Sequence, residues 1–460
     1  MDSEFLDEIP QYNYCCDDSL LIAMQKNKPQ FISLGAATLI LMSGGMHLSL
    51  SFAIPDPFLC VYWFKGSIIG ALIGIICCQI VKKKKFILTS SLLIIIDGIL
   101  LASLSEDNYG VILARFINGI ASGLTFVPLL ILASEESVCN KRGLLVTTVE
   151  TMSISLGIFL YLFIYFVWTK LPHPPIHLIQ MLGLLNIVQG VIALIVQWFF
   201  YVESPMFYLV REEENEAMDS LRRLQYPFVI TSKTHQQLKE HKQYIAHNKE
   251  LTCVSSLVSS LPALLVLCLY RSLVALNYSK PFYYVMFFCS TVLYGTEVWA
   301  FVIMGTLRCM GIFLNMYMID TFGRRQPMLF GSIVCGSLSV VIGMMFDQFP
   351  EMIFRHRMSI IVYLMLMIQF FTGIFIGSSS VYLSEAFPLE IKPVFIGITF
   401  IVEMLVQVNY IVTFDFINSS CYFYSTAITC LGFFFIGLLL LPETKRNTLR
   451  EAQIKFNLLS

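Results

Sequence analysis

The stretch Asp320-Thr-Phe-Gly-Arg-Arg325 holds one acid, one turn-forming glycine and two arginines between two long apolar runs. Such side chains can form ion pairs that close and reopen, but they are costly to place in hydrocarbon. We therefore expect a tight loop at a membrane face. A degraded copy, Gln79-Ile-Val-Lys-Lys-Lys-Lys85, lies between two earlier apolar runs and lacks both the acid and the glycine. Two copies of one loop indicate two halves built on the same plan.

The sequence carries no motif for other chemistry. It has no glycine-rich loop followed by Lys and Ser or Thr, no His-Glu-x-x-His and no Cys-x-x-Cys pair. These absences argue against ATP-driven transport and against a metal site, so we predict no enzyme activity and no cofactor. The 13 cysteines lie mostly inside apolar runs, where a cysteine usually acts as a small buried hydrophobe.

The composition requires lipid as the solvent. The chain is 57% hydrophobic and only 13% charged, whereas a soluble domain carries about 25% charged residues. The net charge of -1, with no basic tract interleaved with aromatics, gives no reason to expect nucleic acid as a partner. We expect the lipid bilayer as the surroundings and a small polar solute as the partner, with the chain acting as a monomer.

Apolar runs of about 20 residues are typical of membrane-spanning helices. They predict an all-α integral membrane protein with 12 transmembrane helices in two six-helix halves. The expected spans are 31–52, 58–80, 86–104, 109–133, 144–168, 178–201, 261–283, 294–318, 327–346, 358–383, 394–417 and 421–441. The expected domains are an N-terminal tail (1–30), a first half (31–202), a polar loop (203–255), a second half (256–441) and a C-terminal tail (442–460).

The basic residues predict the orientation. Most Lys and Arg outside the spans fall on one face, and the other face has only Lys170, Lys280, Arg355 and Arg357. Because basic loops stay in the cytosol, we predict that both termini and the loop 203–255 are cytosolic. Within that loop, acids followed by bases over 212–223 suit a helix dipole, and 238–247 is a second candidate helix. A solvated, disordered loop is the alternative.

Six charged motifs follow one another along the chain. They are Arg115-x-x-x-Gly119-x-x-x-Gly123, Ser134-Glu135 with Arg142-Gly143, Val202-Glu-Ser-Pro-Met206, Asp320–Arg325, Ser384-Glu385-Ala-Phe-Pro388 with Lys392, and Pro442-Glu-Thr-Lys-Arg446. Over nearly the whole chain this order resembles the sugar porter family of the major facilitator superfamily, which includes glucose transporters and insect facilitated trehalose transporters. The resemblance implies the major facilitator fold and sugar transport by alternating access, and the family's facilitators need no coupling ion. Because a carboxylate inside a span, such as Asp97, can relay protons, proton-coupled transport stays open as the alternative.

The same motifs predict a gate at the cytosolic face. They place Glu135 near Arg142, Glu385 near Lys392, and Asp320 near the two arginines that follow it. As exposed pairs they would each contribute about 0–1 kcal/mol, which suits a switch between states of similar energy. The alternative is that these charges only set the topology. The candidate cytosolic gating network is Arg115, Glu135, Arg142, Glu203, Asp320, Gly323, Arg324, Arg325, Glu385, Lys392 and Glu443.

The resemblance also implies a sugar site between the halves, where amide side chains hydrogen-bond hydroxyl groups. Counting from the motifs, the candidate substrate-binding residues are Glu150, Arg271, Ser272, Asn277, Arg308, Ser380, Glu403 and Gln407. In span five the count is loose by one, because counting forward from Arg142 gives Glu150 and counting back from Gly157 gives Thr151. Where the family mostly has amides, this chain therefore has two acids and two arginines. We expect Glu150 or Glu403 to pair with Arg271 or Arg308.

Three interpretations of the charged cavity stay open. Internal ion pairs can hold the cavity while a neutral sugar, hexose or trehalose, still binds. The site can instead be retuned for another polar or charged solute. The chain can also keep the fold without transporting, as a sensor. We predict transport of a small polar solute, most simply a sugar, at the plasma membrane.

Overall fold

The computed structural model describes residues 20–295, 298–348 and 355–457, and in these ranges the chain is helical with no strand. Twelve stretches of these residues are long and apolar enough to cross a membrane. This confirms the predicted all-α fold with 12 spans. Residues 1–19 of the predicted N-terminal tail and 458–460 of the C-terminal tail lie outside the described residues.

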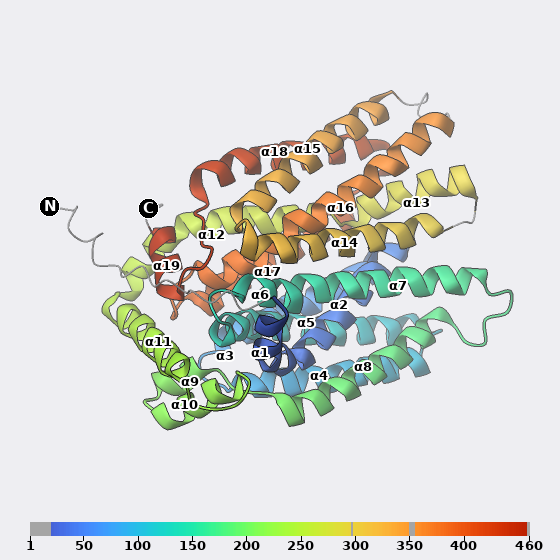
Figure 1. Cartoon of the computed structure of the whole chain (residues 1–460). Helices are drawn as coiled ribbons and strands as arrows, with labels where there is room; N and C mark the ends of the chain where they lie inside the picture. Colours follow the sequence, from blue (N-terminus) through green and yellow to red (C-terminus); the bar gives the residue numbers. More distant parts are fainter. Residues whose placement is uncertain (1–19, 296–297, 349–354, 458–460) are drawn as a thin grey trace.

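The two groups of spans fill different parts of the bundle, the earlier spans mostly below and the later ones mostly above in Figure 1. The earlier group, the first half, comprises α1 (Leu20–Ser33), α2 (Gly35–Ala53), α3 (Pro57–Cys77), α4 (Lys83–Ser103), α5 (Asn108–Glu136), α6 (Arg142–Thr147), η1 (Thr148–Met152), α7 (Ser153–Lys170) and α8 (Leu178–Phe200). The later group, the second half, comprises α12 (Cys253–Leu276), α13 (Lys280–Tyr294), α14 (Trp299–Thr321), α15 (Arg325–Asp347), α16 (Arg355–Glu385), α17 (Lys392–Thr413), η3 (Phe416–Asn418) and α18 (Ser419–Leu440).

Four short helices lie across one end of the bundle (Figure 1). They are α9 (Pro205–Val210), α10 (Glu214–Arg223), α11 (Ser232–Glu250) and α19 (Leu449–Asn457). Both helices predicted for the loop 203–255 are therefore present. We call this end, which holds the loops 78–82, 137–141, 322–324 and 386–391, the charged end. We call the other end the opposite end.

Helix α11 connects the loop helices to the second half. Its Tyr244 hydroxyl donates to the Phe387 carbonyl at 3.4 Å, and its Asn248 side chain accepts from the Leu389 amide at 3.0 Å. Burial raises the pKa of the Tyr244 hydroxyl, so this group stays a proton donor at neutral pH. Burial also lowers the pKa of His241 to about 4, so His241 adds no charge here at neutral pH. The loop helices thus form a strap across the charged end.

The seventh span departs from the prediction. We expected it to end at residue 283, with Lys280 at the far face. Instead α12 ends at Leu276, the chain turns at Asn277, and α13 continues the same apolar stretch to Tyr294. Lys280 is 4% exposed, and its ammonium group lies 3.3 Å from the Pro55 carbonyl oxygen. A span broken inside the bundle hides its irregular backbone from lipid, which hydropathy alone does not indicate.

Helices α3 and α5 pack with their backbones in direct contact. A Cβ atom on Gly119 would lie 2.1 Å from the Trp63 carbonyl oxygen, and one on Gly123 would lie 2.0 Å from the Ser67 carbonyl oxygen. No real side chain tolerates such distances. These two glycines therefore serve close helix packing, as small residues do between membrane helices.

We predict that Gly123→Val forces α3 away from α5 and costs at least about 1–3 kcal/mol. The matched control is Gly432→Val on α18, where a Cβ would meet no atom within 4 Å. Thermal denaturation of the two purified variants, followed by size-exclusion chromatography, should show a clear loss of stability for the first only. Equal stability of the two variants would contradict the close packing.

Candidate functional site

Glu385, the last residue of α16, is the centre of a buried ion cluster at the charged end. Its Oε1 lies 2.9 Å from Arg324 Nη2 and 3.3 Å from Arg142 Nη1, and all three residues are at most 4% exposed. Thr444 donates to the other carboxylate oxygen at 2.7 Å. Arg142 belongs to the first half, whereas Glu385 and Arg324 belong to the second. The cluster therefore joins the halves.

The pairing predicted within each motif is wrong. Arg142 reaches across to Glu385 rather than to Glu135, and Lys392 donates across to Ser134 at 2.7 Å rather than pairing with Glu385. The reason is that each basic residue begins a helix that packs against the other half: α6 packs against α14 and α16, and α17 packs against α3 and α5. The contacts are also buried rather than exposed, so a broken contact costs more than the 0–1 kcal/mol of a surface pair.

Glu135, at the end of α5, has its own basic partner in the first half. Lys83, from the degraded copy of the charged loop, lies 3.0 Å from Glu135 Oε2, and the Ser204 hydroxyl donates to the same oxygen. The neighbouring Glu203 accepts a hydrogen bond from the Lys84 amide at 3.3 Å. Each half thus holds an internal acid–base pair at the charged end.

The loop Asp320–Arg325 is arranged around the carboxylate of Glu443. Its carboxylate accepts hydrogen bonds from the Arg324 and Arg325 amides at 3.0 and 3.1 Å. Gly323 has a φ of +112°, and a Cβ there would lie 2.4 Å from Glu443 Oε2, so only glycine fits. Asp320 accepts from the Leu144 amide at 3.0 Å, where the first turn of α6 offers free N–H groups, and not from the arginines.

Arg115 does not join this network. It lies near the start of α5, whereas Glu135 lies near its end, and 20 residues of helix span about 30 Å. Arg115 is buried at the opposite end, where it donates to the Ser51 hydroxyl and, at 3.3 Å, to the Cys60 carbonyl. The sequence places Arg115 in the gating network because a charge inside a span normally faces the bundle interior or a cytosolic cavity with a partner.

Between the halves, Arg271 of α12 lies between two carboxylates. Its Nη2 is 2.5 Å from Glu403 Oε2 of α17 and 3.2 Å from Glu150 Oε1 of η1. All three residues are at most 8% exposed. They line a cavity of about 30 Å³, which is room for about one water molecule. The cavity is lined by Leu48, Glu150, Thr151, Ile154, Ser155, Arg271, Val274, Tyr278, Arg308, Ile376, Glu403 and Gln407.

Glu150 lies in a π-helical turn between α6 and α7. A π turn inserts one extra residue into a helix, often at a functional site. This explains why counting from the two ends gives Glu150 and Thr151. Both side chains reach the same place: Thr151 donates to Glu150 Oε2 at 2.6 Å and lies 3.1 Å from the Ser380 hydroxyl, which also contacts Glu150.

Arg308 has neutral partners. Its Nε lies 3.3 Å from the Ser155 hydroxyl, its Nη1 donates to Gln369 Oε1 at 3.1 Å, and its guanidinium lies 5.2 Å from the centre of the Tyr278 ring. Gln407 donates to the Tyr278 carbonyl at 2.9 Å and so supports the break between α12 and α13.

Three predicted substrate residues, Ser272, Asn277 and Ser380, lie outside the cavity lining, although Ser380 still contacts Glu150. Asn277 donates to the Leu273 carbonyl at 2.8 Å and accepts from Thr372 at 3.3 Å. The Ser272 hydroxyl donates to the Cys268 carbonyl at 2.9 Å. Asn277 ends α12 and faces its own half. The prediction missed Ser155 and Tyr278, although Tyr278 directly follows the position that had been matched. Recognising that the helix breaks at Asn277 would have moved the predicted substrate residue from Asn277 to Tyr278.

Comparisons with known proteins agree with this geometry. The family model "Sugar (and other) transporter" matches residues 58–456, which is most of the chain. The chain belongs to the sugar transporter family. Similar curated proteins are a probable metabolite transport protein of Bacillus subtilis, CsbC, at 25% identity over 78% of this chain and 77% of that protein, and facilitated glucose transporter member 1 of Gallus gallus, at 26% over 75% and 71%.

Solved structures show the same fold. The proton:xylose symporter XylE bound to 6-bromo-6-deoxy-D-glucose matches with a TM-score of 0.76 at 16% identity, over 92% of this chain and 99% of that one. The inward-open xylose transporter XylE from E. coli matches with a TM-score of 0.64 at 17% identity, over 93% and 98%. This sugar transporter family member is thus a multi-pass membrane protein with the fold of these solved transporters.

In this family member, contacts join the halves at both ends of the bundle. At the charged end they are made by the Glu385 cluster. At the opposite end the Ser49 hydroxyl of α2 lies 2.7 Å from the Tyr278 hydroxyl of the second half. Beside the cavity, Phe126 of α5 stacks on Phe400 of α17 with ring centres 4.2 Å apart. These contacts all join the first half to the second, so opening either end requires the halves to separate there.

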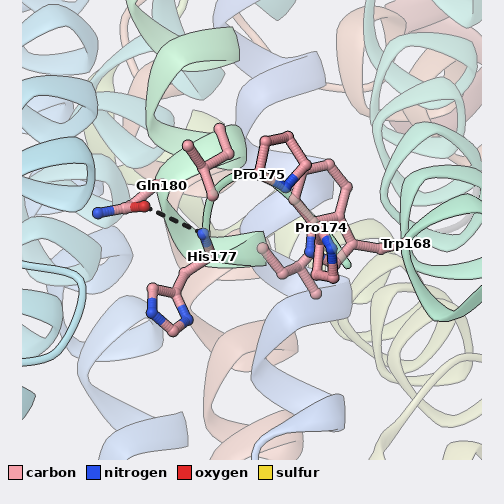
Figure 2. Close-up of a pocket in the computed structure, with 7 residues that line it drawn as sticks. Trp168, Pro174, Pro175, His177 and Gln180 are labelled. Carbon is pink, nitrogen blue, oxygen red and sulfur yellow. Dashed lines mark hydrogen bonds between the residues drawn. The ribbon is translucent and has the colours of Figure 1, made fainter. Parts of the chain in front are cut away.

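A larger hollow, of about 470 Å³, lies away from the central charges where the chain passes from α7 to α8. Figure 2 shows Trp168, Pro174 and Pro175 on one side of it, with Gln180 accepting the His177 backbone N–H at 3.0 Å. None of the predicted substrate residues lines it.

We predict that Glu385→Gln loosens the charged end. The change leaves Arg142 and Arg324 buried without their carboxylate, which costs about 3–5 kcal/mol. Hydrogen exchange of peptides covering 142–147 should become faster, because the Leu144 amide loses its closed environment. Asp219→Asn, which breaks the exposed pair with Arg222, serves as the control and should leave exchange there unchanged. Unchanged protection in both variants would rule out Glu385 as a gate residue.

Proposed function

We propose that this protein carries a neutral sugar, a hexose or trehalose, across the plasma membrane by alternating access. The observation that supports this best is the small cavity between the halves. It is lined by hydrogen-bonding side chains from both halves, and further contacts join the halves at each end of the bundle. Ligands of such transporters bind between the repeats, which then rock around them. We further propose that the charged end is cytosolic and that the protein acts as a monomer.

The central ion pairs are compatible with a neutral solute. Arg271 and Glu403 satisfy most of each other's charge within the second half, with Arg271 Nε also donating to Glu403 Oε2 at 2.8 Å. Around them, Ser155, Thr151, Tyr278 and Gln407 offer neutral donors and acceptors of the kind that sugar hydroxyls use. When the halves move apart, these groups gain the space that the small cavity lacks.

A second candidate is transport of a charged or zwitterionic solute. The observation that favours it is the charge of the cavity lining, where two acids and two arginines replace the amides implied by the family resemblance. A charged solute could then compete with one member of the Glu150–Arg271–Glu403 set. Binding without transport, as in a sensor, is the third candidate, and it predicts no flux at all.

An uptake panel in proteoliposomes tests these candidates directly. We expect saturable uptake of a labelled hexose or of trehalose by the purified protein, inhibited by the unlabelled sugar. Lys65→Gln, an exposed change on α3 outside the cavity, should transport at the same rate. Uptake confined to charged solutes would favour the second candidate. Absence of uptake across the panel, from protein shown to be folded, would overturn the proposal.

We predict that the three central charges act as one set. Arg271→Gln alone leaves two buried carboxylates close together, so it should lower stability by about 3–5 kcal/mol and abolish uptake. The triple change Glu150→Gln, Arg271→Gln and Glu403→Gln removes all three charges, and thermal stability should return close to that of the original protein. If the triple variant is stable and still carries the neutral sugar, the charges are structural. If it is stable but inactive, they recognise the solute.

A further inference from the structure

The loop between α10 and α11 exposes a run of apolar side chains. Tyr226, Phe228, Val229 and Ile230 are 59%, 47%, 59% and 47% exposed, and Pro227 among them is exposed as well. The Tyr226 and Phe228 rings pack edge to face with centroids 5.8 Å apart, so they form one surface. Consecutive apolar side chains left outside a core mark an interaction site. We call the segment Tyr226–Ile230 the apolar loop.

The helices on either side of the apolar loop do not bury it. Leu221 of α10 and Leu238 of α11 lie in a small buried core of the strap, and the apolar loop is not part of that core. Phe228 has a φ of +65°, a conformation that is unfavourable for a bulky side chain. Such positions persist where the surrounding structure imposes them, often at sites that bind something. The strap thus keeps these side chains at its surface.

The apolar loop has basic residues on both sides. Arg222 and Arg223 precede it and Lys233 follows it, all three exposed. Between residues 217 and 235 the chain has these three bases and a single acid, Asp219, which pairs with Arg222. The acids Glu213–Glu216 lie at the other end of α10, roughly 10–15 Å away along the helix. An apolar surface with a basic rim matches a membrane surface with anionic headgroups.

The strap places the apolar loop at the outer edge of the charged end. Tyr244 of α11 contacts the second half, and Ser232, where α11 begins, lies 12 residues earlier, which is about 18 Å of helix. Figure 1 shows α11 running from the side of α12 towards α9 and α10, which lie on the side of α4 and α8. Arg211, just after α9, is fixed there by donating to the Ile80 carbonyl at 3.1 Å.

This edge also marks the membrane surface. Helix α8 ends with Trp198, Phe199 and Phe200, all exposed, and the Lys84 ammonium lies 5.9 Å from the centre of the Trp198 ring. Aromatic and basic side chains at the end of a span are typical of the boundary between hydrocarbon and water. The strap begins at Pro205, five residues after Phe200. The headgroup layer extends about 5–7 Å beyond the hydrocarbon, so the strap starts at its level.

We propose that the apolar loop inserts into the membrane leaflet next to the charged end, with Arg222, Arg223 and Lys233 on anionic lipid headgroups. The bilayer then holds the strap at its outer edge, while Tyr244 and Asn248 hold it to the second half. This inference goes beyond the proposed transport and does not depend on which solute the protein carries.

A tryptophan reporter tests the insertion in the full chain. The Phe228→Trp change is made in a background in which the four native tryptophans are Phe, and the protein is placed in nanodiscs of phosphatidylcholine and phosphatidylserine. Phospholipids brominated on the acyl chain should quench the emission of this reporter. Gln243→Trp in the same background, an exposed position further along α11, is the matched control and should not be quenched. Equal quenching of the two reporters would overturn the insertion.

The role of the bases is tested by lipid charge. Nanodiscs of phosphatidylcholine alone should quench the Phe228→Trp reporter less than those with phosphatidylserine. Changing Arg222, Arg223 and Lys233 to Gln should remove this difference, whereas Lys242→Gln with Lys249→Gln, exposed bases further along α11, should preserve it. The same quenching in both lipid mixtures would overturn the assignment to anionic headgroups.

Hydrogen exchange of a peptide covering 225–231 tests the proposal on the unchanged chain, should the background variant fail to fold. Exchange should be slower in nanodiscs with phosphatidylserine than in phosphatidylcholine alone, and equal exchange would contradict the proposal. Reporter emission that shifts to the blue without quenching by brominated lipid would show that protein covers the apolar loop, and would overturn the lipid assignment. Neither measurement needs transport, so failure of the proposed function leaves both results unaffected.

Discussion

Charge buried between two moving halves is the constraint on which the rest of this structure depends. A carboxylate or guanidinium removed from water must stay paired in every state that the protein adopts. The contacts meet this requirement in a particular way. In the centre the second half supplies both Arg271 and Glu403, and the first half adds Glu150. At the charged end the second half supplies Arg324 and Glu385, and the first half adds Arg142.

This arrangement lowers the free-energy cost of separating the halves. If the halves part as proposed, each acid–base pair of the second half can stay together, and only the third charge has to move into a water-filled space. The first half mirrors it at the charged end, where Lys83 and Glu135 form the internal pair and Lys392 docks beside them from the second half. The closed state thus gains buried contacts without making the open state hold a bare buried charge. Two states of comparable energy are what alternating access requires.

Much of this could be predicted from the sequence, and the failures have physical causes. The length of the apolar runs predicted the number of spans correctly. Counting from the motifs predicted five of the residues that line the cavity, Glu150, Arg271, Arg308, Glu403 and Gln407. Motifs could not say which acid meets which base, because that depends on how α6 and α17 cross the interface. Counting residues assumes an unbroken α-helix, so it failed by one at the π turn and again at Asn277, where α12 ends. Hydropathy could not predict the His47–Asp97 pair, because a single charged residue in an apolar run does not indicate which residue of another helix it contacts.

The degraded loop shows how a contact can survive the loss of its acid. In the second half, the carboxylate of Asp320 binds the Leu144 amide at the start of α6, a contact strengthened by the helix dipole. In the first half, Gln79 has no charge to place there, and its amide group instead donates to the Glu390 carbonyl, just before α17. The halves are still joined on this side, but by a neutral hydrogen bond. The charges on this side come from other residues, Lys83 with Glu135 in the first half and Lys392, which docks on Ser134 from the second.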